Sequence, residues 1–181
     1  MFTAFDFDGT LIKGDSIKHF ARWVSRNKLE FYIKYYGLIY FSSSLTRLKF
    51  IRVEYFYRKM QERALSIEDF DTLLSKMMYE DTYPLLEQIE DDVLVVSASF
   101  KEIIGSFCKR TLKVELISNE LSRPEIDVNG YHKVIALKES KGDDVIINKA
   151  YGNSKGDYPL LDYALKGYLR TSRGVLVDYN K

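Results

Sequence analysis

Cysteine, histidine and proline are scarce in this chain of 181 residues, which has one Cys, two His and three Pro. A single cysteine cannot form an internal disulfide, and Cys108 lies in the apolar run IIGSFC. We therefore expect a buried thiol in a protein of a reducing compartment. The two histidines, His19 and His132, have no recognisable partner residue, and we interpret both as structural.

The sequence also lacks an amino-terminal signal and a long apolar segment. Its start, MFTAFDFDGT, has two Asp within ten residues and no basic region, unlike a secretory signal. The longest aromatic and aliphatic stretch, residues 31–41, contains Lys34 and Gly37 and has about half the length that a membrane-spanning helix requires. These absences predict a cytoplasmic protein that does not cross a bilayer.

The net charge is low, at +1, but the charges are unevenly distributed. Residues 18–63 contain eleven Lys or Arg and three Glu, together with twelve of the 26 aromatic residues. This segment indicates an anionic partner. Nucleic acid is not favoured, because the positive charge is confined to one helical segment and no nucleic-acid motif accompanies it. The oligomeric state stays open, since an aromatic-rich surface can also pack against a second copy.

Residues 16–79 have the pattern of several helices. Apolar residues recur three and four apart, for example in residues 17–24, which is the period of an amphipathic helix. Breaks are expected at Gly37, at residues 42–44 and at Ser66, which is placed to cap a helix. We predict three or four helices and no strand in this segment.

The rest of the chain alternates between strand and helix patterns. A first strand is expected at residues 2–7, and Pro84 suits the first turn of a helix. Further strands are expected at residues 92–97, 113–118, 145–151 and 174–177, and helices at residues 100–109, 133–139 and 157–165. Such alternation predicts a parallel sheet with helices on both faces, in which ligands bind at the carboxyl ends of the strands.

The sequence FDFDGTLIKGD places two aspartates at the end of the first expected strand. In an extended chain Asp6 and Asp8 point to one side, while Phe5 and Phe7 point to the other, toward a core. Crowded carboxylates repel one another unless a cation lies between them, and their oxygens suit Mg²⁺. We expect a magnesium site here. A solvated acidic turn is the less favoured alternative.

With these features the chain resembles the haloacid dehalogenase-like superfamily, and within it the phosphoserine-phosphatase-like branch with a helical cap after the first strand. The resemblance extends over nearly the whole chain. It implies an α/β fold: a Rossmann-like parallel-sheet core of residues 1–14 and 84–181, with an inserted small α-helical cap domain of residues 15–83. The cap would close over the site, exclude water and select the substrate.

The first motif of the family, Asp-x-Asp-Gly-Thr, falls on residues 6–10. The resemblance implies that Asp6 attacks phosphorus and becomes an aspartyl-phosphate. It implies that Asp8 protonates the leaving oxygen and then activates water. Thr10 would belong to the phosphate-binding residues.

The second and third motifs indicate two further phosphate-binding residues. Ser97, in VLVVSAS, would bind a phosphate oxygen. Alternatively, Ser97 or Ser99 caps the following helix, and the two roles are compatible. Lys133, in GYHKVIALKE, would neutralise the phosphate and the nucleophile, with Lys138 and Lys141 as competing lysines.

The fourth motif, Gly-Asp-Ser-x-x-Asp, is similar to GNSKGD at residues 152–157. Asn153 stands where an acid is expected to bind the metal. An amide oxygen can ligate Mg²⁺ but adds no charge, so we expect weaker affinity. The resemblance implies a metal site of Asp6, Asp8, Asn153 and Asp157. A helix cap is the alternative role for Asp157.

Three functions are compatible with this pattern. The first is hydrolysis of a small phosphomonoester, and the second is action on a phospholipid or lipid-carrier head group at an anionic membrane surface. The third is a weakened or inactive protein that binds a phosphate ligand. Candidates to contact the leaving group are Asp15, Arg47, Arg52 and Arg58, although a solvated role is favoured for each.

The aromatic cluster of the cap has helical spacing, which favours a cap core over a lipid-facing surface. Its members are Phe31, Tyr32, Tyr35, Tyr36, Tyr40 and Phe41.

Overall fold

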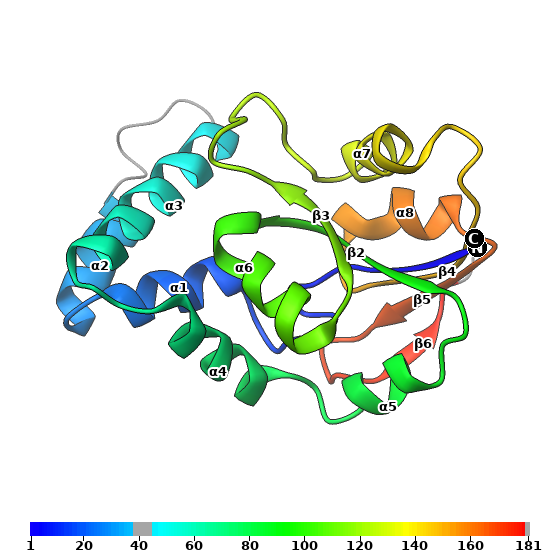
Figure 1. The fold of residues 1–181 in the computed structure, drawn as a ribbon, viewed down its shortest axis with the longest axis horizontal. Helices are drawn as coiled ribbons and strands as arrows, with labels where there is room; N and C mark the ends of the chain where they lie inside the picture. Colours follow the sequence, from blue (N-terminus) through cyan, green and yellow to red (C-terminus); the bar gives the residue numbers. More distant parts are fainter. Residues whose placement is uncertain (38–44, 180–181) are drawn as a thin grey trace.

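The computed structural model describes residues 1–37 and 45–179, without the side chains of residues 45 and 46. A six-stranded sheet with the order β3-β2-β1-β4-β5-β6 forms its centre (Figure 1). The strands are β1 (Phe2–Phe5), β2 (Asp92–Phe100), β3 (Glu115–Asn119), β4 (Ile147–Gly152), β5 (Lys166–Arg170) and β6 (Leu176–Asp178). All pairs are parallel except β5 with β6. The predicted α/β class with a Rossmann-like sheet is confirmed.

Side chains alternate between the two faces of the sheet, as the strand period requires. Phe5 and Val95 belong to one buried cluster, which also contains residues of α6 (Lys101–Phe107). Ala4 and Val96 belong to the other cluster, with residues of α7 (His132–Lys141) and α8 (Tyr158–Tyr163). Helices therefore cover both faces of the sheet, as predicted (Figure 1).

The segment between β1 and β2 is helical in its described part. It contains α1 (Ser16–Val24), α2 (Lys28–Gly37), α3 (Leu45–Glu62), α4 (Ile67–Met77) and the short α5 (Thr82–Glu87). These helices confirm the predicted helical segment. Gly37 is the last described residue before the gap, so the break expected there stays a prediction. The predicted break at residues 42–44, with Tyr40 and Phe41 of the aromatic cluster, lies outside the described residues.

Local signals at the helix ends agree with the structure. The Ser66 hydroxyl accepts a hydrogen bond from the Glu68 N–H and caps α4, as expected. Pro84 lies in the first turn of α5, where the missing N–H of proline costs no helical hydrogen bond. The helix predicted at residues 100–109 is α6, and it continues in a π-helical turn, η2 (Cys108–Leu112).

Two strand predictions differ from the structure. The first strand was expected to reach Phe7, but β1 ends at Phe5, because the Phe7 carbonyl accepts hydrogen bonds from N–H groups of the following turn. The last strand, β6, is antiparallel to β5, since only a tight turn joins them, and tight turns reverse the chain. β5 itself was not predicted, because KGYLR has a glycine and charged ends.

The helices between β1 and β2 share a hydrophobic cluster with the sheet. The Phe20 ring of α1 contacts Phe70 of α4 at a centroid distance of 5.2 Å, and both side chains belong to the same buried cluster as Phe7. In the part of the chain that the structure describes, no helix combines the length and apolar character needed to cross a membrane.

Candidate active site

Asp6 follows β1 at the carboxyl edge of the sheet. Its N–H donates a hydrogen bond to the Tyr151 carbonyl of β4 over 2.8 Å, so the ladder holds its backbone in place. β1 lies between β2 and β4, where the direction of strand addition reverses, and crevices for ligands form at such points. The carboxylate is buried, accepting hydrogen bonds from Lys133 Nζ over 2.6 Å and from the Thr10 hydroxyl over 3.2 Å.

Lys133 is buried in the first turn of α7 and joins two carboxylates. Its Nζ donates to Asp6 Oδ1 and to Asp157 Oδ1, each over 2.6 Å. Burial alone would lower the pKa of this lysine, but the charges of Asp6 and Asp157 outweigh burial and hold its pKa above the ordinary value. A permanent positive charge therefore lies against the Asp6 carboxylate.

Asp157 holds both Lys133 and the loop that follows β4. Its Oδ2 accepts hydrogen bonds from the N–H groups of Asn153 and Ser154 and from the Ser154 hydroxyl. The bond from the Ser154 N–H is one half of a capping box at the 3-10 turn η3 (Lys155–Asp157), and in the other half the Ser154 side chain accepts from the Asp157 N–H. The contacts of Oδ2 match the alternative role of Asp157 as a cap, while its predicted role as a metal ligand stays a prediction.

Asp8 is held by residues that sequence reasoning did not single out. The Ser16 N–H donates to Asp8 Oδ1 over 2.7 Å, and the Ser16 hydroxyl donates to Oδ2 over 3.1 Å. The Ser16 hydroxyl also lies 2.7 Å from that of Ser99, whose N–H donates to the Ser97 hydroxyl over 3.0 Å. This chain links Asp8 to the predicted phosphate-binding serine.

Both aspartates of the first motif have raised pKa values. Burial is the main cause at Asp6, where it raises the pKa to about 6 with a further contribution from Asp157 and against the attraction of Lys133. Burial also raises the pKa of Asp8 to about 8, helped by the charges of Asp15 and Asp6. A carboxyl group with a pKa near 8 is mostly protonated at neutral pH, as a general acid must be.

Asn153 lies close to the turn that follows the two aspartates. A Cβ placed on Gly9 would lie 2.0 Å from Asn153 Nδ2, so the amide occupies the space that a side chain at Gly9 would fill. Gly9 also has a φ of +71°, which favours glycine. Asn153 and Asp8 both line an open cleft of about 720 Å³.

The same cleft has several cations on its other walls. Lys18 and Arg22 of α1 are exposed along it, and Arg170, at the end of β5, also lines it but is buried. Arg170 is paired with Asp81 and lies over the Tyr79 ring, 4.2 Å from its centroid. Sequence reasoning missed these residues, because they come from distant segments and have no shared motif.

Other predicted candidates lie away from Asp6 or at the surface. Lys138 lies over the Tyr163 ring, and Lys141 pairs with Glu115, which leaves Lys133 as the lysine at the nucleophile. Arg58 pairs with Glu54 at the surface.

The remaining candidates can be placed in the same way. Arg47 is exposed, while the Arg52 guanidinium lies 4.6 Å from the Tyr35 ring centroid. His132 Nδ1 is 3.1 Å from the Asp127 carbonyl. The N-cap residue of α6 is Phe100, so neither Ser97 nor Ser99 occupies the capping position.

The donor set at this edge fits a small hard cation. In the described residues no three His, Cys, Asp or Glu side chains form a ready metal cluster. The two neighbouring carboxyl groups, Asp6 and Asp8, nevertheless have raised pKa values, chiefly because both are buried, and a bound cation would offset that cost of burial. Carboxylate oxygens with an Asn carbonyl and water are ligands that Mg²⁺ accepts.

Known structures share this fold. A protein of unknown function from Bordetella pertussis Tohama I superposes with a TM-score of 0.64 at 15% identity, over 92% of this chain and 88% of that one. A phosphoserine phosphohydrolase-like protein from Francisella tularensis superposes with a TM-score of 0.61 at 19% identity, over 92% of this chain and 86% of that one. A phosphoserine phosphatase in its apo form superposes with a TM-score of 0.50 at 17% identity, over 93% of this chain and 84% of that one. At these identities the likeness shows the fold.

The sequence comparisons identify the family. No curated protein sequence matches this chain. The family model of haloacid dehalogenase-like hydrolases matches residues 3–162, which include Asp6 and Asp8 after β1, Lys133 of α7 and the loop after β4. The chain therefore belongs to the haloacid dehalogenase-like hydrolase family.

Proposed function

We propose that this protein is a phosphatase that hydrolyses a small phosphomonoester through an aspartyl-phosphate on Asp6. The observation that carries the proposal is the buried contact between the Asp6 carboxylate and Lys133 at the carboxyl edge of the sheet. A buried carboxylate beside a fixed ammonium group can attack phosphorus while the ammonium group binds the phosphate oxygens.

The reaction has two steps with balanced proton transfers. In the first, an Asp6 oxygen forms a bond to phosphorus, the bond to the leaving oxygen breaks, and Asp8 donates its proton to that oxygen. In the second, Asp8 takes a proton from water and the water oxygen attacks phosphorus. The bond between phosphorus and the Asp6 oxygen then breaks, which releases inorganic phosphate and restores the free Asp6 carboxylate. The raised pKa of Asp8, about 8, supports the first proton transfer.

Three side chains are proposed to bind the transferring phosphoryl group. Lys133 supplies positive charge, and the Thr10 hydroxyl lies beside Asp6. The Ser97 hydroxyl accepts a hydrogen bond from the Ser99 N–H, and it retains its own proton to donate to a phosphate oxygen.

Mg²⁺ is the proposed cofactor, held by Asp6, Asp8 and Asn153. It would neutralise charge on the transferring phosphoryl group. With Asn153 in place of an acid, the site has one carboxylate fewer, so the proposal includes a weak magnesium affinity. Asp157 is proposed as a positioning residue, because it orients Lys133 and the Asn153 loop.

Residues 15–83 are proposed as the cap that selects the substrate. The cleft beside Asp8 is lined by Lys18 and Arg22 of α1, which favours a substrate that has an anionic group besides its phosphate. A lipid head group is the second candidate substrate, and the exposed aromatic residues of α2 favour it.

The test is turnover of an aryl phosphate with Mg²⁺ by the parent protein, Asp6→Asn and Asp143→Asn. Asp143 is an exposed aspartate between α7 and β4 and serves as the matched control. We expect the parent and Asp143→Asn to turn over equally and Asp6→Asn to have no detectable activity with an unchanged circular dichroism spectrum. Activity in Asp6→Asn would contradict the role of Asp6. Phosphate binding without turnover by the parent would instead support a binding protein.

A further inference from the structure

The outer surface of α2 has four exposed apolar side chains on one side of the helix. Leu29 is 68% exposed, Tyr32 and Ile33 are each 56% exposed, and Tyr36 is 39% exposed. Their spacing of three, four and seven residues places them on one face, which we name the α2 stripe. The rings of Tyr32 and Tyr36 stack at a centroid distance of 5.8 Å.

The opposite side of α2 is already packed. Phe31 is 3% exposed and Tyr35 is 9% exposed, and both belong to the main hydrophobic cluster. The expectation that the aromatic residues form cap core is therefore correct for these two residues and wrong for Tyr32 and Tyr36. Since the inner side fixes the helix, the α2 stripe faces outward in the folded protein.

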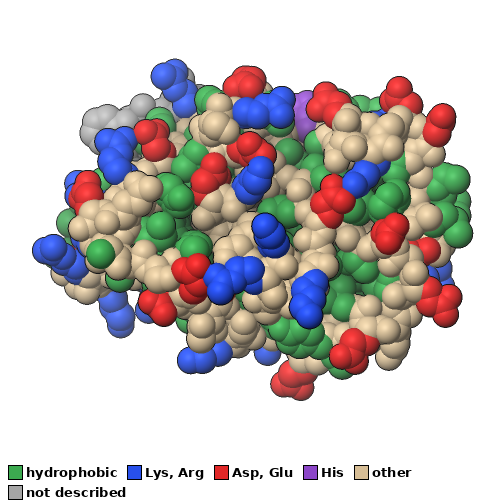
Figure 2. Space-filling model, viewed as in Figure 1, with side chains coloured by type: hydrophobic (Ala, Val, Ile, Leu, Met, Phe, Trp, Pro, Cys, Tyr) green, Lys and Arg blue, Asp and Glu red, His purple; other side chains and the backbone are tan. Residues whose placement is uncertain are grey.

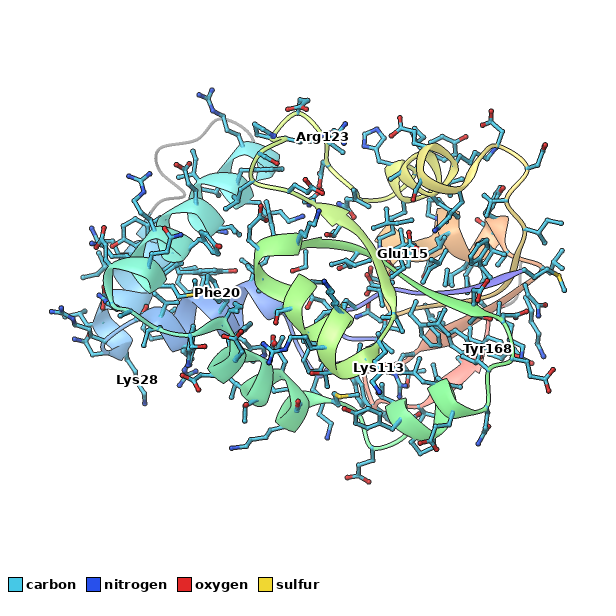
Figure 3. The ribbon with its side chains drawn as sticks, viewed as in Figure 1. Phe20, Lys28, Lys113, Glu115, Arg123 and Tyr168 are labelled. Carbon is cyan, nitrogen blue, oxygen red and sulfur yellow. The ribbon has the colours of Figure 1, made fainter. Side chains whose placement is uncertain are left out.

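The charges around the α2 stripe are positive. Lys28 and Lys34 lie on α2, and Arg26 lies just before it; all three are exposed. The only acidic residue of α2, Glu30, pairs with Arg63 over 2.6 Å, so its charge is neutralised locally. Lys and Arg side chains project from the end of the molecule formed by α1 to α3 (Figure 2), and Lys28 points away from the ribbon there (Figure 3).

We propose that the α2 stripe and its flanking cations dock this protein on an anionic lipid surface. Apolar residues on one helix face enter the boundary between head groups and acyl chains, while adjacent Lys and Arg bind anionic head groups. Tyrosine suits this boundary, because its ring is apolar and its hydroxyl is polar. A stable protein interface buries about 800 Å² per partner, more than four side chains on one short helix present.

The inner side of α2 is tied to the rest of the protein. Phe31 and Tyr35 belong to the same buried cluster as Phe5 and Phe7, the neighbours of Asp6 in the sequence. Docking through the outer side therefore leaves these inner contacts of α2 in place. The docking itself does not depend on the proposed phosphatase activity.

The experiment is co-sedimentation of the whole protein with phosphatidylcholine vesicles, with and without phosphatidylglycerol. We expect binding to the anionic vesicles, little binding to the neutral ones, and a steep loss of binding as salt rises. Lys28→Gln with Lys34→Gln should weaken binding by about 25-fold, which is about fivefold for each cation. Lys109→Gln, at an exposed lysine of η2, is the control.

A second pair of variants tests the apolar part of the surface. Leu29→Ser should abolish binding, whereas Leu165→Ser should not change it, although Leu165 is 69% exposed. Equal binding by Leu29→Ser and the parent would overturn the proposal, and so would the absence of binding by the parent. A dimer of the parent that Leu29→Ser converts to a monomer would also overturn it, because the stripe would then be an interface between copies.

Discussion

Charged side chains are buried and paired at the carboxyl edge of the sheet around Asp6, called the catalytic edge below, whereas they are exposed on the outer side of α2. At the catalytic edge, Lys133 is buried between Asp6 and Asp157, and every one of these charges has an opposite partner within 2.6 Å. On α2, Lys28 and Lys34 stand exposed beside apolar side chains. The comparison separates charges that fix the geometry of a site from charges that are available to a partner.

The physical reason is the cost of burial. A buried charge requires a partner, because removal of one member leaves the other desolvated and uncompensated. Exposed ion pairs such as Arg58 with Glu54 contribute little. Substitutions at the catalytic edge should therefore change stability and activity together, while those on α2 should change only binding.

The largest expected effect on stability is at Lys133. Lys133→Met leaves Asp6 and Asp157 as unpaired buried carboxylates, so we expect the free energy of unfolding to fall by about 3–5 kcal/mol. Urea denaturation followed by circular dichroism measures it. Lys138→Met, on the same helix, is the control and should cost about 1 kcal/mol or less, the value of its contact with Tyr163.

A double variant sharpens this prediction. Asp157→Asn removes one of the two carboxylate charges that Lys133→Met leaves unpaired, but it keeps an oxygen for the N–H groups of the loop. Lys133→Met with Asp157→Asn should therefore be more stable than Lys133→Met alone, by about 1–2 kcal/mol. A double variant that is less stable than the single one would show that the loop contacts of Asp157 outweigh its pairing with Lys133.

The next effect concerns the metal. Asn153→Asp restores a carboxylate next to Gly9 and Asp8, so we expect Mg²⁺ to bind about tenfold more tightly, equivalent to about 1.4 kcal/mol. A magnesium titration of activity in the parent and the variant measures the shift. An unchanged half-saturating concentration would show that position 153 is not a metal ligand.

The smallest effect is expected at Asp71, a buried aspartate of α4 away from the site. Burial raises its pKa, and although the Ser106 hydroxyl donates to its Oδ2, Oδ1 has no hydrogen-bond partner. Because the folded-state pKa is the higher one, its ionisation lowers stability as pH rises from the ordinary pKa of aspartate through the raised value. Asp71→Asn should therefore gain melting temperature relative to the parent as pH rises across this window.

Thermal melts at about pH 3.5 and at neutral pH check the Asp71 prediction, with the exposed Asp143→Asn as the control. A difference in melting temperature between Asp71→Asn and the parent that is the same at both pH values would contradict it.

Much of this fold follows from local patterns. The helix start at Ser66 and the alternation after β2 both have local signals, and the structure has the expected elements at these places. β5 escaped prediction, because its five residues owe their strand conformation to pairing with β4 and β6. Tertiary pairing of that kind is not encoded in the local sequence.

In the candidate site, too, residues with a local sequence signal were predicted, and residues that only folding brings together were not. The resemblance to the first and third motifs of the family pointed to Asp6, Asp8 and Lys133, because each lies in a short segment with a recognisable sequence. Ser16 and Ser99 are brought to Asp8 only by the folded chain. No spacing in the sequence relates residues 83 positions apart.

The most direct test of the central claim is detection of a phosphoryl group on Asp6. Asp8→Asn slows both proton transfers, but an activated aryl phosphate needs little protonation of its leaving group, so hydrolysis of the intermediate should become the slower step. Acid quenching followed by intact-protein and peptide mass spectrometry should show one phosphoryl group on the peptide that contains Asp6. It should be absent from Asp6→Asn with Asp8→Asn. Turnover by the parent with no phosphorylated Asp6 in any quenched sample, and equal turnover in Asp6→Asn, would contradict the account.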